Sequence, residues 1–312
     1  MNKDGIKVKF WGVRGSYPAA DKNFLEYGGN TACAEVNAAG HTIIIDGGTG
    51  IIPLGNMLYR EHTASACSIF DRKPMNLTML LSHVHQDHIQ GLNFFKPMNV
   101  ITSRISLFGY SGFDSKLDEI LSELVYGKSF PINLYDTAAD YSMRDISESD
   151  IVILNDKSPE PVLKRIACED DLKPKNNEVI ISFMKLNAHP NFGVMCFKIA
   201  YKNKSIVYAA DTECWQGGSK KLELFAKDTD LLIHDSQYTL EDYISAVSPR
   251  QGYGHSTFDM AENTAAASNA KRLACFHFDP SYNDTELRKI EKELTGRNKN
   301  YFLAKEGMEI CI

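Results

Sequence analysis

The stretch Ser82-His83-Val84-His85-Gln86-Asp87-His88 decides the fold, and it directly follows an apolar run at residues 77–81. Imidazole and carboxylate groups are ligands that borderline divalent metals take, so a buried strand that ends in this cluster predicts a metal site. Side chains alternate along an extended chain, so His83 and His85 point the same way. Asp87 and His88 then lie where the chain turns into a helix, within reach of a second metal.

Length, composition and charge limit the classes of function. The 312 residues are enough for one large domain or two small ones, and 43% apolar with 24% charged residues is ordinary globular composition. The net charge of -6 argues against a protein that coats long nucleic acids, which needs a basic face. A small anionic substrate stays compatible with this charge, because bound metals add local positive charge.

Cysteine usage and the absence of long apolar runs indicate the compartment. The seven cysteines are an odd number and form no C-x-x-C pair, so we expect buried thiols and no disulfide framework. No apolar run is long enough to span a bilayer, and residues 1–5 lack the apolar core of a signal peptide. We therefore expect a cytoplasmic protein without a membrane partner.

Short strands and helices follow one another along the chain. Hydrophobic periodicity predicts strands at 6–13, 34–37, 42–45, 77–81, 100–110, 179–187, 194–201, 205–209, 231–234, 272–276 and 301–311, and helices at 53–62, 115–126, 258–269 and 284–294. Ser115 is a predicted helix cap. The segment 112–177 weakens this pattern, and we interpret it as an insertion that forms a lid or a dimer contact, or as a surface excursion of the domain.

Ionisable residues recur where the predicted strands end. Beyond the opening motif these are His189, Asp211, Asp235 and His277. Sheets whose strands lead to one rim bring such residues together in space. Two metals about 3.5–4 Å apart need a bridging carboxylate and several ligands each, and the sequence offers that set. The loop at residues 46–50 is rich in glycine but has no G-K-[ST] or G-x-G-x-x-G pattern, so a nucleotide cradle is not supported.

The order of these motifs resembles that of the metallo-β-lactamase superfamily. Asp87 resembles the phosphodiesterase branch, and the elements around His255 and His277 resemble those of phosphoribosyl cyclic phosphodiesterases and tRNA 3′-processing endonucleases. The resemblance covers nearly the whole chain. It implies an α/β fold, a four-layer αββα sandwich in one domain (1–312), with a dinuclear metal site at one rim of the sheets.

The resemblance also assigns roles to single residues. One metal would be held by His83, His85 and His189, and the second by Asp87, His88 and His277, with Asp211 bridging them. Zinc is the expected metal, and manganese or iron are alternatives because His/Asp sites accept each of them. The implied reaction is phosphodiester hydrolysis by a metal-bridging hydroxide, since two metals lower the pKa of a shared water. His255, oriented by Asp235, would stabilise the developing charge or protonate the leaving oxygen.

Several alternatives stay open at this point. The expected substrate is a small cyclic or nucleotide-like phosphodiester, and a tRNA 3′-end endonuclease is the alternative within the same chemistry. The acidic net charge and the lack of a basic, glycine-rich arm weigh against RNA. A third alternative is a non-hydrolytic diiron protein that binds oxygen or acts as a sensor. Resembling proteins of that kind generally carry a carboxylate in place of the motif's second histidine, so His85 argues against this alternative. A homodimer also stays open, because dimers are common among the resembling proteins.

Three further residues lie outside the metal motifs. Position alone makes Arg14 and Tyr253 candidates for substrate contact. His62 belongs to no motif, so we expect it at the surface.

Overall fold

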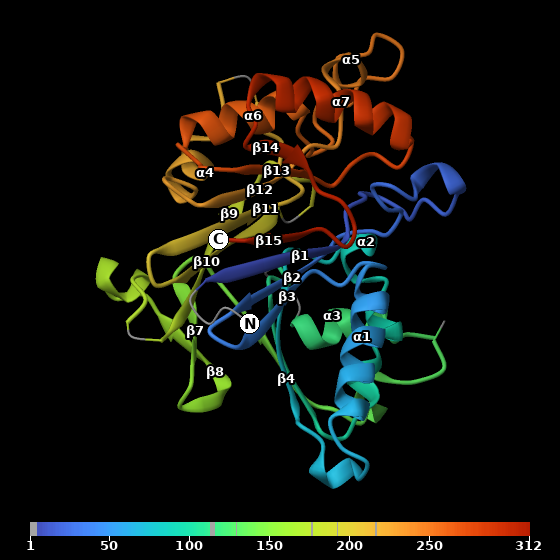
Figure 1. The fold of residues 1–312 in the computed structure, drawn as a ribbon, viewed down its shortest axis with the longest axis vertical. Helices are drawn as coiled ribbons and strands as arrows, with labels where there is room; N and C mark the ends of the chain where they lie inside the picture. The colour runs from blue at the N-terminus through green and yellow to red at the C-terminus, as the bar shows by residue number, and fades with distance from the viewer. Residues whose placement is uncertain (1–4, 113–115, 129, 176, 192, 216) are drawn as a thin grey trace.

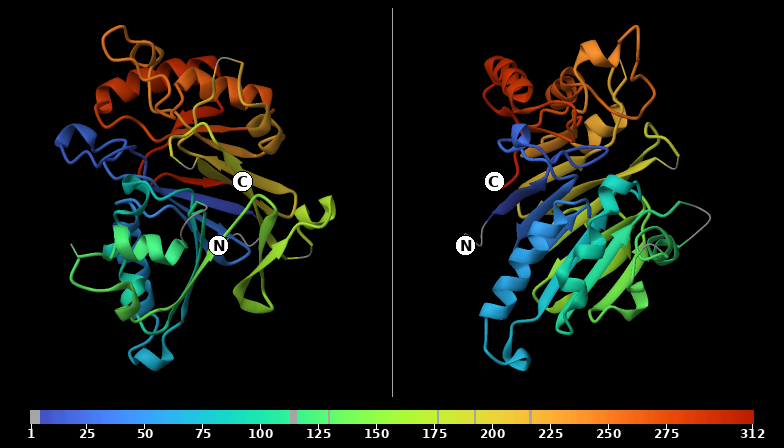
Figure 2. Two further views of the ribbon diagram at one scale, coloured as in Figure 1. Left: turned by 180° about the vertical axis from the view of Figure 1, so that it is seen from behind. Right: turned by 90° about the vertical axis from the view of Figure 1, so that its right-hand side faces the viewer.

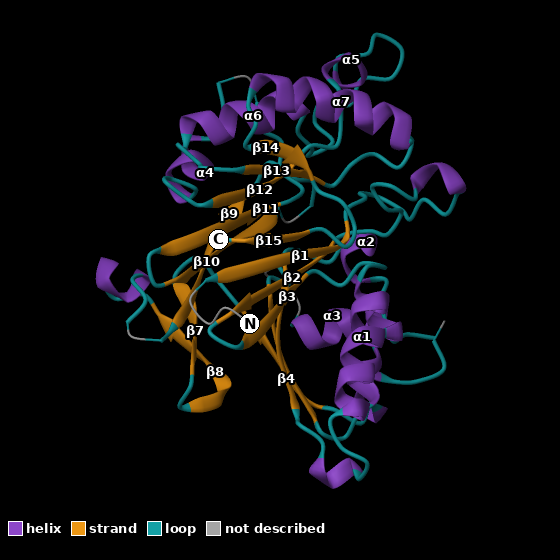
Figure 3. Ribbon diagram, viewed as in Figure 1, coloured by secondary structure: helices purple, strands orange, loops and turns teal. Residues whose placement is uncertain are grey.

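The structure, a computed structural model, describes residues 5–112, 116–128, 130–175, 177–191, 193–215 and 217–312. Two β-sheets lie face to face, and helices cover their outer sides (Figure 1). Figure 2 shows from two further directions that the long light-blue helix α1 (Ile51–Ala64) and the long red helix α7 (Asp284–Arg297) lie on opposite sides of the sheets. The alternation of strand and helix layers in Figure 3 is the predicted αββα sandwich.

The first sheet has seven strands in the described residues, in the order β15-β1-β2-β3-β4-β5-β6. Their bounds are β1 (Ile6–Gly12), β2 (Cys33–Ala38), β3 (His41–Ile45), β4 (Met75–Leu81), β5 (Ser103–Gly109), β6 (Asp140–Asp145) and β15 (Glu309–Cys311). Strands β3, β4, β5 and β6 run parallel. The carboxyl ends of these strands therefore lead to one rim, where the opening motif follows β4.

The second sheet has eight strands in the described residues, in the order β14-β13-β12-β11-β10-β9-β7-β8. Their bounds are β7 (Asp150–Asn155), β8 (Ser158–Arg165), β9 (Val179–Leu186), β10 (Val194–Tyr201), β11 (Lys204–Ala209), β12 (Leu231–Asp235), β13 (Leu273–Phe276) and β14 (Tyr301–Leu303). Strands β11 to β14 are parallel, so their carboxyl ends also share one rim.

The helices divide between the two outer layers. Their bounds are α1 (Ile51–Ala64), α2 (Gln86–Ile89), α3 (Leu117–Leu124), α4 (Lys220–Phe225), α5 (Leu240–Tyr243), α6 (Phe258–Ala267) and α7 (Asp284–Arg297). Helices α1 and α3 pack on the first sheet, and α6 and α7 pack on the second. Within the described residues, no helix is both long and apolar enough to cross a bilayer.

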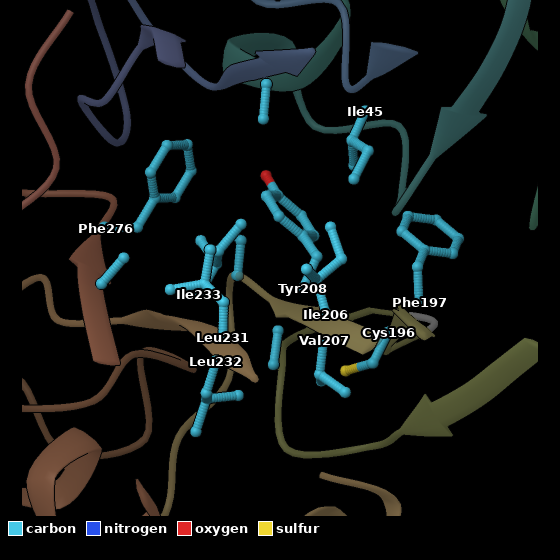
Figure 4. Packing of buried hydrophobic residues seen from close by; sticks show 14 of the residues in the cluster. Ile45, Cys196, Phe197, Ile206, Val207, Tyr208, Leu231, Leu232, Ile233 and Phe276 are labelled. Atoms are coloured by element: carbon cyan, nitrogen blue, oxygen red, sulfur yellow. The ribbon is translucent and has the colours of Figure 1, made fainter. Parts of the chain in front are cut away.

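Successive side chains of β3 pack alternately into two buried hydrophobic clusters. Ile43 and Ile45 belong to the buried cluster between the sheets, whereas Ile44 packs on the other side with residues of α1 and α3. This is the period of two that an internal strand requires. Figure 4 shows Tyr208 of β11 in the core between the sheets, near Phe276 of β13, with its hydroxyl oxygen directed toward the first sheet.

The segment 112–177 contributes strands to both sheets. It supplies α3 and the edge strand β6 to the first sheet, and the β7–β8 hairpin to the edge of the second. The predicted cap at Ser115 lies outside the described residues, and the helix begins at Leu117. The lid and the dimer contact stay predictions.

The predicted single strand at 301–311 is wrong. The chain forms two short strands instead, and β14 belongs to the second sheet whereas β15 pairs with β1 in the first. The turn between them contains Gly307 with a φ of 81°, a left-handed conformation that glycine adopts without steric cost. The carboxyl-terminal residues therefore link the two sheets.

Candidate metal centre

The rims of the two sheets bring the predicted site residues together. Asp211 follows β11, Asp235 ends β12 and His277 follows β13, while the opening motif follows β4 and enters α2. Asp211 and His277 have left-handed φ angles of 52° and 67°. Left-handed backbone in non-glycine residues costs free energy and persists where the surroundings impose it, as at functional sites. These strand ends are therefore shaped to direct side chains into one place.

All seven predicted metal ligands lie in two groups that share one residue. The first group is His83, His85, His189 and Asp211, and the second is Asp87, His88, Asp211 and His277. Within each group, one potential ligand atom per residue lies within 4.8 Å of the others. Asp211 is 1% exposed and belongs to both groups. The geometry is that of two adjacent sites joined by one carboxylate.

The outer ring nitrogens of three histidines face hydrogen-bond acceptors. His88 Nδ1 lies 2.8 Å from Asp46 Oδ2, His189 Nδ1 lies 3.1 Å from the Gly254 carbonyl oxygen, and His277 Nδ1 lies 3.1 Å from Gln237 Oε1. An acceptor keeps the proton on Nδ1 of a neutral imidazole. Each Nε2 then carries a lone pair that is free to bind a metal.

The inner atoms of the second group require a positive charge among them. His88 Nε2 lies 3.1 Å from His277 Nε2, and both lie within 3.1 Å of Asp211 Oδ1. Burial lowers the pKa of His88, but Asp211 and the other carboxylates around it raise this pKa well above its usual range. His88 therefore sits where a proton or a metal cation is strongly stabilised. This is the behaviour expected of residues that fit a divalent metal.

The first group contains an unpaired buried nitrogen atom. His83 Nε2 is buried and makes no hydrogen bond to the described residues, and the nearest carboxylate oxygen, Asp211 Oδ2, lies 3.5 Å away. Burial, followed by the neighbouring His88, lowers the pKa of His83 well below its usual range, so its imidazole is neutral. Unpaired buried polar atoms are costly in a protein unless a partner satisfies them. A metal ion bound by His83 Nε2 and the other three side chains of this group fits the donor set.

The carboxylates of the two groups stay ionised. Burial raises the pKa of Asp211, but His277 and His88 outweigh it and hold this pKa well below its usual range. The pKa of Asp87 is likewise well below its usual range, because His88 and His277 offset the effect of burial. The backbone N–H of Ser16 also donates to Asp87 Oδ2 at 2.7 Å. Both carboxylates are therefore anionic when they face the imidazoles.

His255 and Asp235 form a hydrogen-bonded pair, and with Asp211 and His277 they make up a third group of possible ligands. His255 Nδ1 lies 2.8 Å from Asp235 Oδ2, and the ring stacks on that of His277 with 5.2 Å between centroids. Burial lowers the pKa of His255, but Asp235 outweighs it and raises this pKa to about 9. Asp235 Oδ1 accepts the backbone N–H of Ser256 at 2.9 Å. Because Oδ1 is held by this backbone N–H, Asp235 Oδ2 is fixed toward the ring of His255.

The residues that support the histidines were not predicted from the sequence. Asp46 is fully buried and accepts from Ser82 N at 2.8 Å, Tyr208 Oη at 2.7 Å and His88 Nδ1. Gln237 supports His277 in the same way. Asp46 follows a strand and has a left-handed φ of 61°, so its position after β3 was the available signal.

The predictions for Arg14 and His62 are wrong. Arg14 is fully buried, and its guanidinium donates to the carbonyl oxygens of Gly28 at 2.7 Å and Tyr282 at 2.6 Å, so it holds loops together instead of facing a substrate. His62 is also buried, with Nδ1 2.9 Å from the Lys73 carbonyl oxygen. Tyr253 is 50% exposed, and substrate contact by its ring stays a prediction.

Comparisons with known proteins agree with this fold. Residues 41–278 match a family model described as the beta-lactamase superfamily domain. A Ribonuclease Z of Picrophilus torridus is 24% identical over 98% of this chain and 96% of its own length. The metallo-beta-lactamase fold protein YhfI from Bacillus subtilis superposes with a TM-score of 0.63 at 18% identity, covering 99% of this chain and 100% of that one. Human tRNase Z, short form, gives 0.61 at 17% identity, covering 97% and 98%.

Proposed function

The chain belongs to the beta-lactamase superfamily, and we propose that it is a dinuclear metal-dependent hydrolase that cleaves phosphodiester bonds. One observation carries this proposal: Asp211 belongs to the group of His83, His85 and His189 and also to the group of Asp87, His88 and His277, so one carboxylate can serve two metals. Metal pairs joined in this way are typical of enzymes that displace groups at phosphorus. The Ribonuclease Z relative, similar over nearly its whole length, supports the same class of reaction.

The two metals would divide the ligands as the sequence analysis predicts. His83, His85 and His189 would hold one, Asp87, His88 and His277 the other, and Asp211 both. Bound divalent ions lower the pKa of a coordinated water and neutralise the charge of a phosphate group. Zinc is proposed as the metal, because imidazole-rich sites with carboxylates suit it, and manganese or iron remain alternatives.

His255 is proposed as the group that protonates the leaving oxygen. Its Nδ1 is occupied by Asp235, so in the imidazolium form its Nε2 still carries a proton to donate. In the metal-free protein burial lowers the pKa of this ring, but Asp235 outweighs it and raises the pKa to about 9, which favours the imidazolium form. Asp235 is then a positioning residue, because it acts on the reaction by orienting His255.

The substrate is proposed to be a small cyclic or nucleotide-like phosphodiester. The net charge of -6 supports this choice over RNA, since long RNA binding draws on a basic surface. The second candidate is cleavage at the 3′ end of tRNA, which the Ribonuclease Z relative favours. A diiron oxygen-binding protein is disfavoured by His85, whose imidazole lies in the first group.

The experiment is hydrolysis of bis(p-nitrophenyl) phosphate by the zinc-loaded protein. We expect turnover that is lost in Asp211→Ala and in His85→Ala. His41→Ala is the matched control, because His41 is at the start of β3 and belongs to neither group. Undiminished turnover in Asp211→Ala would contradict the proposal, as would an oxygen-dependent visible spectrum without any turnover.

A second panel separates the substrates. Cyclic and linear mononucleotide and dinucleotide phosphodiesters are compared with a 3′-extended tRNA precursor at equal concentration. Faster cleavage of the small esters supports the proposed substrate. Faster, site-specific cleavage of the precursor would replace it with the tRNA reaction.

A further inference from the structure

We propose that Glu213 is a positioning residue of the metal centre, which fixes the backbone of Gly254 and thereby holds His189 and places His255. The part of this inference that concerns His255 rests on the proposed function, in which His255 protonates the leaving oxygen. Glu213 lies two residues beyond Asp211 and is 1% exposed, although it belongs to neither group of potential ligands. A buried carboxylate outside the reacting site calls for a physical explanation, because burying a charge is costly unless it is fully hydrogen-bonded.

Among the described residues, three donors hydrogen-bond to this carboxylate. Glu213 Oε1 accepts from Tyr243 Oη at 2.6 Å and from the backbone N–H of Gly252 at 2.8 Å. Glu213 Oε2 accepts from the backbone N–H of Gly254 at 2.9 Å. Hydrogen bonds to an ionised acceptor are about twice as strong as neutral ones. Glu213 therefore joins the segment after Asp211 to the loop that leads into His255.

Gly254 passes this restraint directly to the site. Its N–H is held by Glu213, and its carbonyl oxygen accepts from His189 Nδ1 at 3.1 Å. That same carbonyl belongs to the peptide unit that begins His255. One residue thus sets the ring orientation of a potential ligand and the starting point of the proposed proton donor.

The contact between Gly254 and His189 leaves no free space. A Cβ added at Gly254 would lie 2.4 Å from His189 Nδ1 and 2.5 Å from Pro190 Cδ. Gly254 also has a φ of 89°, where glycine is favoured. A displacement of this backbone must therefore move His189, and Glu213 is the side chain that prevents it.

A purely structural role for Glu213 makes a different prediction. If the carboxylate only anchored the loop, its loss would lower thermal stability and weaken both metals alike. If it positions Gly254, its loss acts mainly on the group that contains His189. The group of Asp87, His88 and His277 has no direct contact with Gly254 among the described hydrogen bonds.

The experiment measures the affinities of the two zinc equivalents in Glu213→Gln. An amide has one acceptor oxygen and an NH2 donor, so it cannot accept from all three neighbours and must oppose at least one of them. Tyr243→Phe is the matched control, because it removes the hydroxyl donor and leaves both backbone N–H bonds intact. Zinc is titrated against a competing chelator without substrate, and His189→Ala identifies the equivalent bound by the first group.

We expect Glu213→Gln to weaken the equivalent identified by His189→Ala, and to leave the other as in the wild type. Changing a partner of a ligating histidine typically costs about 10–100-fold in metal affinity. Tyr243→Phe should keep both affinities. Two unchanged equivalents in folded Glu213→Gln would overturn the inference, and so would equal weakening of both.

Two provisions keep this test decisive. If Glu213→Gln does not fold, Glu213→Asp replaces it, because the shorter side chain keeps the carboxylate but withdraws it from the Gly254 N–H. Two unchanged zinc affinities, or equal weakening of both, would again overturn the inference. The titration uses no phosphodiester. A protein that binds two zinc ions with the expected asymmetry and hydrolyses nothing would refute the proposed function and keep this inference.

Discussion

Gly254→Ala and Gly252→Ala form a matched pair that tests how tightly the loop before His255 controls the metal centre. Both glycines have positive φ angles, 89° and 83°, so alanine meets a similar backbone penalty of about 1–3 kcal/mol at each. Their surroundings differ. A Cβ at Gly252 meets nothing within 4 Å, whereas at Gly254 it lies 2.4 Å from His189 Nδ1.

The size of the expected effect follows from that distance. Ordinary contact begins at 3.4 Å, so His189 or the loop must move by about 1 Å to admit the new methyl group. A misplacement of about 1 Å can cost about 10²-fold in rate. We expect Gly254→Ala to lower kcat/KM for bis(p-nitrophenyl) phosphate by about this factor, and Gly252→Ala to stay close to the wild type.

Thermal unfolding of both variants accompanies the kinetic assay. Similar losses of stability with very different activities would show that the effect comes from the contact with His189 and not from the shared backbone penalty. Equal activities of the two alanine variants would refute the reasoning. So would a fully active Gly254→Ala protein.

Three further outcomes follow from the site. Asp46→Ala should weaken zinc binding by about 10–100-fold, because it removes the acceptor that orients His88, and Tyr208→Phe, which removes one donor to Asp46, should weaken it less in the same chelator titration. In metal-free protein the His255 pKa is raised to about 9, so the imidazolium's contact with Asp235 stabilises the folded state fully below pH 6.5, and this contribution is lost as pH rises through about 9. The free energies of unfolding of wild type and Asp235→Asn should therefore differ at low pH and converge at high pH. Removing the metals with a chelator should lower the melting temperature, since a ligand at 100 times its Kd stabilises the folded state by about 2.7 kcal/mol, and calorimetry with and without zinc measures the shift.

Residues that follow the strands of a sheet could be predicted from the sequence. His83, His85, Asp211 and His277 each follow an apolar run, and strand alternation together with a common rim is enough to bring them together. Asp235 was predicted beside His255, and the structure places these two side chains in hydrogen-bond contact.

Supporting residues were missed because their partners are distant in the chain. Asp46 meets His88 and Tyr208 only after two sheets have packed together, and no local pattern shows this. Glu213 meets a loop about Gly252 and Gly254 for the same reason. The burial of Arg14 was not predicted, because the carbonyl oxygens that accept from its guanidinium belong to distant loops and leave no pattern in the sequence.

The break in the last predicted strand has a different cause. Tyr301, Leu303 and Ile310 are apolar residues on either side of the polar Lys305 and Glu306, and hydrophobic pattern alone does not show that the chain changes sheets between them. The change depends on the left-handed turn at Gly307 and on the free edge that β1 offers to β15.

The measurement that tests the shared carboxylate most directly is the hydrolysis rate as a function of bound metal. Metal-free protein is titrated with zinc, and the rate with bis(p-nitrophenyl) phosphate is measured at each addition. Two sites joined by Asp211 predict a rate that rises until two equivalents per chain are bound and is constant thereafter. Full activity at one equivalent, or no hydrolysis at any ratio, would contradict a dinuclear phosphodiesterase.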